Sequence, residues 1–164
     1  MTPNSASASG FALAAPIVVV EDSDEDFDTV CEAAASSGVT RMIHRVTSGG
    51  DCLAMLRGEG KLHLPSLPLL PILPVVILMD LNSHGVDGRE ALVAIKTDVA
   101  FKKIPLLVLT TSSNPKDVAF CYQAGANAYH VKPVRHENYL LLLRSLMHYW
   151  LDTVTPHVAS ERVD

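Results

Sequence analysis

The chain has 164 residues, of which 48% are hydrophobic and 19% are charged, and its formal net charge is −5. This size and composition are typical of one soluble globular domain with a buried core, with or without tails. No cluster of lysine and arginine runs along any segment, so direct binding to DNA or RNA is not expected.

Short apolar runs alternate with amphipathic segments along most of the chain. Polar caps and closing glycines, the usual start and stop signals of helices, bound several of the amphipathic segments. The third apolar run is continuous, as expected of a central parallel strand covered on both faces. The predicted strand and helix pairs are, in chain order, 17–20 with 24–37, 41–47 with 48–58, 75–79 with 87–100, 106–110 with 115–124, and 126–131 with 136–153. Five such pairs without an internal repeat predict an α/β fold, with a doubly wound, five-stranded parallel sheet and helices on both faces.

The regions outside these pairs have their own signatures. Residues 1–15 are rich in Ser and Ala but lack a basic leader, so we expect a disordered tail rather than a signal peptide. Residues 62–79 imitate a membrane span, but their prolines recur at every third position, which opposes a helix and matches polyproline II. We therefore expect a Pro-rich insertion at 58–74 and no contact with a membrane. Its role is open between a passive connector and a segment that lies against the protein or a partner.

The three cysteines, Cys31, Cys52 and Cys121, are widely spaced and form no CxxC pair. An odd number of separated thiols disfavours both a disulfide framework and a zinc site. Free thiols in a reducing cytoplasm are the simpler interpretation, so a cytoplasmic location is expected.

Charged and hydroxyl side chains stand at the carboxyl ends of four predicted strands. Glu21 and Asp22 follow the first strand and Asp80 follows the third, whereas Thr110 ends the fourth and Lys132 follows the fifth. In open α/β sheets, ligands bind beyond this edge. Two carboxylates about 4 Å apart repel by roughly 4 kcal/mol at an effective dielectric near 20. A Mg²⁺ ion relieves that repulsion and also accepts phosphate oxygens.

This set predicts phosphoryl transfer. Asp80 lies at the most buried strand end and is the candidate nucleophile, since aspartyl phosphates are a known type of covalent intermediate. Lys132 can neutralise phosphoryl oxygens and Thr110 can donate a hydrogen bond to them. Each residue alone has an ordinary explanation as a helix cap or a solvated charge. Their conjunction at separate strand ends favours the functional interpretation.

Five motifs around this edge resemble the receiver domain of bacterial two-component response regulators, over residues 17–153. They are VVVEDS, LMDLN, VDG, VLTTS and HVKP. The resemblance implies a flavodoxin-like sheet with strand order 2-1-3-4-5, and a sensor histidine kinase that donates a phosphoryl group to Asp80. It also implies a Mg²⁺ ion with the following ligands: Glu21 through water, Asp22, Asp80 and the backbone carbonyl of Asn82.

The resemblance also implies a conformational switch. Tyr129 stands at the position of the switch aromatic, three residues before Lys132, and would turn inward as the Thr110 hydroxyl moves toward the phosphate. A tyrosine that merely closes the edge of the core is the alternative. The peptide bond before Pro133 is usually cis in this family, which would aim the ammonium at Asp80.

A narrower likeness concerns the small response regulators paired with bacterial and cyanobacterial phytochromes. The stretches DGREALVAIK, IPLLVLTTS and YWLDTV carry it. It implies a stand-alone receiver domain at 16–153, a C-terminal tail at 154–164 and a phytochrome-type kinase as partner. The chain departs from the family at His84, where proline is common.

The last predicted helix suggests a second copy of the chain as a further partner. A helix that packs only on its own sheet needs one apolar stripe. The apolar residues of this helix instead wrap well over half of it, which favours a homodimer through this helix, as in the phytochrome-type regulators. Packing by the insertion or by the N-terminal tail is the alternative. These residues are Tyr139, Leu140, Leu141, Leu142, Leu143, Leu146, Met147, Tyr149, Trp150 and Leu151.

The sequence thus predicts a phosphorelay receiver rather than an enzyme, with only self-phosphotransfer and slow loss of its own phosphate. One alternative is an adaptor on the same fold that works without phosphorylation. A less favoured alternative is a phosphohydrolase with an aspartyl nucleophile, because no general acid is evident near Asp80. The sequence contains no HExxH, GxGxxG, Walker A or GxSxG motif that would indicate other chemistry.

Overall fold

The structure is a computed structural model, and it describes residues 15–59, 73–82 and 88–157. Within them, five parallel strands form one sheet in the order β2-β1-β3-β4-β5, which confirms the predicted fold class. The predicted N-terminal tail before residue 15, most of the predicted Pro-rich insertion, His84 and the end of the predicted C-terminal tail lie outside the described residues. No helix in the described ranges is long and apolar enough to cross a membrane.

The elements follow the predicted alternation of strands and helices. The strands are β1 (Ile17–Val20), β2 (Ile43–Val46), β3 (Val76–Met79), β4 (Leu106–Thr110) and β5 (Ala128–Val131). The helices are α2 (Asp24–Ser36), α3 (Gly49–Leu56), α4 (Gly88–Thr97), α5 (Pro115–Ala124) and α6 (His136–Met147), and α6 continues into the π-helical segment η1 (His148–Thr153).

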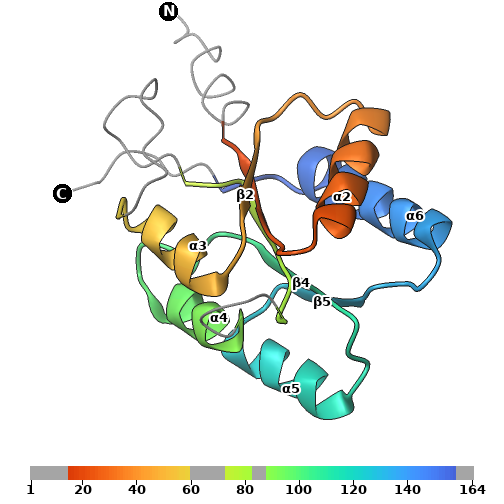
Figure 1. The fold of residues 1–164 in the computed structure, drawn as a ribbon. Helices are drawn as coiled ribbons and strands as arrows, with labels where there is room; N and C mark the ends of the chain where they lie inside the picture. The colour runs from red at the N-terminus through yellow and green to blue at the C-terminus, as the bar shows by residue number, and fades with distance from the viewer. Residues whose placement is uncertain (1–14, 60–72, 83–87, 158–164) are drawn as a thin grey trace, which may run out of the picture.

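Helices cover both faces of the sheet (Figure 1). α2 and α6 pack against each other on one face, and α3, α4 and α5 follow one another across the other face. Alternate residues of each strand face these two layers. Val18 and Val20 of β1 belong to the core with α3 and α4, whereas Ile17 and Val19 belong to the core with α2 and α6. Both faces of β1 are thus buried, and this explains why every residue of the strand is apolar.

Local signals set several helix ends where the sequence predicts them. Ser23 caps α2, since its Oγ accepts a hydrogen bond from the Asp26 N–H at 3.2 Å. Asn114 caps α5 in the same way, with Oδ1 accepting from the Lys116 N–H at 3.0 Å. Gly125 closes α5 with a φ of 102°, a left-handed conformation that favours glycine.

Two helix ends differ from the prediction. α4 ends early because the Asp98 carboxylate accepts the Ala100 N–H at 2.8 Å, a local hydrogen bond that competes with the helical one. The last predicted helix is two elements rather than one, since α6 gives way to η1. At the end of η1 the Val154 N–H donates to the Tyr149 carbonyl, five residues earlier, at 2.8 Å. Trp150 stays packed against the core of the α2 and α6 face in this arrangement.

Candidate functional site at the carboxyl edge of the sheet

Three carboxylates converge where β1 and β3 end. Glu21 and Asp22 directly follow β1, and Asp80 directly follows β3. The two strands pair in register up to their last residues, and the Asp80 N–H donates to the Val20 carbonyl at 3.0 Å. One carboxylate oxygen from each of the three acids lies within 4.8 Å of the others. Carboxylates this close repel one another unless a cation lies between them, so the set is a candidate site for a divalent cation.

Glu21 is buried, and both of its carboxylate oxygens accept hydrogen bonds. Oε1 accepts from the Ser23 N–H at 3.0 Å, and Oε2 accepts from Lys132 Nζ at 2.6 Å. Burial raises the pKa of this carboxyl, because the loss of water outweighs the stabilising contacts with Lys132 and Ser23. Arg45 of β2, which was not predicted as a site residue, fixes the backbone of this loop. Its guanidinium donates to the Glu21 carbonyl at 2.9 Å and to the Asp22 carbonyl at 3.1 Å.

Lys132 enters the acidic cluster from the end of β5. Its side chain is only 5% exposed, and Nζ donates to Glu21 Oε2 at 2.6 Å, Asp26 Oδ2 at 2.7 Å and Asp80 Oδ2 at 3.0 Å. Burial alone would lower the pKa of the ammonium, but the contacts with Asp26, Glu21 and Asp80 outweigh it and raise the pKa. The described peptide bonds are all trans, including the one before Pro133. The expected cis bond is therefore wrong for this structure, in which the ammonium reaches Asp80 from a trans bond.

Asp26 is the main site residue that sequence reasoning missed. It lies in the first turn of α2 and contacts Lys132, although 106 residues separate the two in the chain. Its only signal in the sequence was an acidic residue in the first turn of a helix that starts at this edge. That signal is weak, because acidic residues are common in first turns through the helix dipole.

Thr110 and Asn82 form the other side of the site. Thr110 ends β4 and is fully buried. Its hydroxyl oxygen accepts hydrogen bonds from the Asn82 side-chain amide at 3.2 Å and from the Ser112 N–H at 3.3 Å. The Asn82 N–H in turn donates to Asp80 Oδ1 at 3.0 Å. Asn82 thereby connects the candidate nucleophile to the candidate switch hydroxyl.

Tyr129 is half-buried and meets the same loop as Thr110. Its hydroxyl donates to the Ser112 carbonyl at 2.8 Å. Burial raises the pKa of this phenol, so it stays protonated and able to donate. Ser112 therefore contacts both predicted switch residues, one through its N–H and the other through its carbonyl.

A charged bridge fixes the position of Ser112. Its hydroxyl donates to Asp117 Oδ2 at 2.5 Å, and Asp117 Oδ1 accepts from Arg89 Nη2 at 2.9 Å. The hydrogen bond from Ser112 and the ion pair with Arg89 hold the pKa of the Asp117 carboxyl below its usual range. Because Arg89 lies in the first turn of α4 and Asp117 lies in α5, the bridge joins two helices to the loop after β4.

The glycine of the VDG motif has a steric role next to the site. Gly88 begins α4, and a Cβ at this position would lie 2.8 Å from Leu81 Cα and 2.9 Å from the Asp80 carbonyl oxygen. Contacts that short force the backbone to shift. Glycine therefore allows α4 to start directly against the segment that carries the candidate nucleophile.

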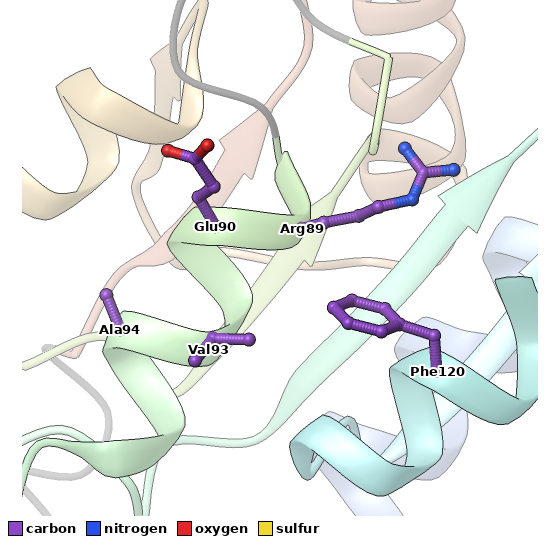
Figure 2. Close-up of a pocket in the computed structure, with 5 residues that line it drawn as sticks. All are labelled: Arg89, Glu90, Val93, Ala94 and Phe120. Carbon is purple, nitrogen blue, oxygen red and sulfur yellow. The ribbon is translucent and has the colours of Figure 1, made fainter.

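A surface hollow lies apart from the acidic cluster, between α4 and α5 (Figure 2). Figure 2 shows Arg89 and Val93 on the side of α4 that faces the ring of Phe120 of α5. Glu90 and Ala94 complete the lining of the hollow. None of these five residues was predicted from the sequence to act in phosphoryl transfer. The chemistry predicted from the strand ends therefore has its place at the carboxyl edge of the sheet and not in this hollow.

The fold and this edge define a class of proteins that the comparisons confirm. Residues 17–144 match the model of the response regulator receiver domain, and the chain belongs to this family. It is 34% identical over 139 residues to Response regulator Rcp1 of Synechocystis sp., a match that covers 85% of this chain and 90% of the relative.

Solved structures of phytochrome response regulators agree with this assignment. The phosphorylated cyanobacterial phytochrome response regulator RcpA has a TM-score of 0.80 and 34% identity, covering 88% of this chain and 99% of that one. The Mn²⁺-bound form of response regulator Rcp1 has a TM-score of 0.79 and 33% identity, with the same coverage. Both the predicted family and its narrower likeness to phytochrome response regulators are thus confirmed.

Proposed function

We propose that Asp80 accepts a phosphoryl group from a sensor histidine kinase in a Mg²⁺-dependent phosphorelay. A carboxylate oxygen of Asp80 would form the new O–P bond as the P–N bond of the kinase phosphohistidine breaks, and the imidazole would leave. The observation that carries the proposal is the meeting of Asp80 with the buried Lys132 ammonium at 3.0 Å inside a cluster of three converging carboxylates.

The donor set fits a hard divalent cation. Glu21, Asp22 and Asp80 offer carboxylate oxygens, which Mg²⁺ prefers, and family membership adds the Asn82 backbone carbonyl. When bound, the ion would neutralise charge on the phosphoryl oxygens and the carboxylates. A solved relative is a Mn²⁺-bound form, which supports a divalent cation at this edge.

The protein's own groups have separate roles in the proposal. Lys132 neutralises a phosphoryl oxygen, because its ammonium already contacts the Asp80 carboxylate. Thr110 turns its hydroxyl from Asn82 toward the new phosphate, and Tyr129 follows inward. The chain turns over no separate substrate in this scheme and loses only its own phosphate. The adaptor and the phosphohydrolase are not proposed, since no observation favours either.

The partner that we propose is a phytochrome-type sensor histidine kinase. Support comes from the relatives, whose names identify them as phytochrome response regulators. We propose a cytoplasmic location for this reaction, and the free thiols of Cys31, Cys52 and Cys121 support it. No nucleic-acid or membrane partner belongs to this proposal.

We also propose that two copies of the chain associate through α6 and η1. Tyr139, Leu143 and most of the other apolar residues of this segment are buried or half-buried against the chain's own core, so the apolar excess is smaller than the sequence suggested. Leu141 and Tyr149 remain 59% and 52% exposed, with the half-buried Trp150 beside Tyr149. These side chains are the proposed centre of the contact.

Phosphorylation with a small donor tests the central proposal. Wild-type protein incubated with acetyl phosphate and Mg²⁺, or with a phytochrome-type kinase and ATP, should gain one acid-stable, alkali-labile acyl phosphate, read by mass spectrometry. Asp80→Asn should abolish the label, and a chelator should prevent it. A label that survives in Asp80→Asn, or wild-type protein that never takes one from either donor, would contradict the proposal.

A further inference from the structure

The Lys132 ammonium has three N–H groups, and each has one carboxylate acceptor. Glu21 and Asp26 are the nearer acceptors, at 2.6 and 2.7 Å, and Asp80 is the farther one, at 3.0 Å. An ammonium has three donors and no acceptor, so these contacts use its whole capacity. If two of the donors are fixed, the direction of the third follows from the tetrahedral geometry of the nitrogen.

Asp26 differs from the other two acceptors in what it contacts. Glu21 and Asp80 belong to the group of carboxylates that converge for a cation, whereas Asp26 does not belong to that group. Its side chain is 33% exposed, and its described ion pair is with the buried Lys132. This carboxylate therefore contacts the lysine from outside the group of converging carboxylates.

A short loop fixes both anchors of the lysine relative to each other. The Ser23 N–H donates to Glu21 Oε1 at 3.0 Å, and Ser23 Oγ accepts from the Asp26 N–H at 3.2 Å. The cap that starts α2 therefore also ties the Glu21 carboxylate to the backbone of Asp26. Helix α2 in turn packs against α6.

We propose that Asp26 is a positioning residue that acts through Lys132. Together with Glu21 it fixes two of the three ammonium N–H groups and so directs the third toward the carboxylate of Asp80. This inference rests on the proposed function for its kinetic consequence. Its structural content, the immobilised ammonium, stands independently of phosphorylation.

Removal of the Asp26 carboxylate should slow phosphorylation of Asp80. In Asp26→Ala the ammonium loses one anchor and its third donor is no longer directed. We expect the rate with acetyl phosphate at saturating Mg²⁺ to fall about tenfold, given that misplacement by about 1 Å can cost a hundredfold. Asp26→Asn, whose amide oxygen can still accept from the ammonium, should restore much of the rate.

The matched control is Glu25→Ala, which removes an exposed acid from the same first turn of α2. Glu25→Ala removes one negative charge near the N-terminus of α2, as Asp26→Ala does, so the two variants have the same net charge and lose a similar interaction with the helix dipole. The phosphorylation rate of Glu25→Ala should stay within about twofold of wild type. Lys132→Met provides the second comparison. If Asp26 acts through the lysine, adding Asp26→Ala to Lys132→Met should change the rate by less than about twofold.

A measurement without phosphate separates this inference from the proposed function. In the wild type, the ¹⁵N signal of the Lys132 ammonium should show slow exchange of its protons with water. Exchange should quicken in Asp26→Ala and stay slow in Glu25→Ala. An ammonium that exchanges equally in both variants, or a tenfold loss of rate that persists in the Lys132→Met background, would overturn the inference. A wild-type protein that takes no phosphate would overturn only the proposed function.

Discussion

Negative charge exceeds positive charge around Asp80. The carboxylates of Glu21, Asp26 and Asp80 share one lysine, and Asp22 lies close to two of them. Like charges at such distances repel when the ion that would balance them is absent. The site is therefore arranged for ligand binding at some cost to stability, as expected where function requires buried charge.

Stability should depend on Mg²⁺ through Asp80. At a Mg²⁺ concentration about 100 times its Kd, binding adds about 2.7 kcal/mol to the free energy of unfolding. For a chain of this size that is a rise in Tm of about 5–10 °C. In a chelator, Asp80→Asn should melt above the wild type, because one repelling charge is gone, and it should respond much less to Mg²⁺. Differential scanning calorimetry measures both effects, and an equal response of the two proteins to Mg²⁺ would argue against a cation at this carboxylate.

Helices α4 and α5 are joined by a bridge that also reaches the loop after β4. Arg89 and Ser112 both bond to the Asp117 carboxylate, so the two helices and the predicted switch loop share one anchor. The hydrogen bond from Ser112 is the largest single cause that lowers the pKa of the Asp117 carboxyl. The bridge should therefore persist well into the acidic range.

The pH dependence of an Asp117→Asn variant tests this bridge. A carboxyl whose pKa is lower in the folded protein than its ordinary 3.8 contributes stability that is fully present above that value. The contribution disappears as pH falls through the lower pKa of the folded state. Urea unfolding should therefore show wild type more stable than Asp117→Asn at pH 7, with a difference that shrinks below pH 3.8. The exposed Asp28→Asn serves as the control, and a difference that stays constant across this range would exclude the bridge as its source.

At the scale of the whole molecule, the topology and the edge that carries the site were predictable from the sequence. Alternating runs and local caps such as Ser23 and Gly125 give the elements, and the rule for parallel sheets gathers the strand ends. The contact between Asp26 and Lys132 was not predictable, because it depends on how α2 is rotated over the sheet. The change from α6 to η1 was missed because the apolar pattern continues through it without a break.

The surface of α6 and η1 permits a test of the proposed homodimer. Leu141 is exposed, so Leu141→Arg places a charge in the proposed contact without disturbing the core. Two such charges meet across a symmetric interface, and the dimer should weaken by at least about tenfold. Sedimentation equilibrium should find about twice 17.7 kDa for the wild type at micromolar concentration and 17.7 kDa for the variant. Val99 lies just beyond α4 and is an exposed apolar residue outside the proposed contact, so Val99→Arg is the matched control and should leave the mass unchanged. A wild-type mass of one chain at every concentration would show that the half-buried Trp150 and Leu151 need no second copy to cover them.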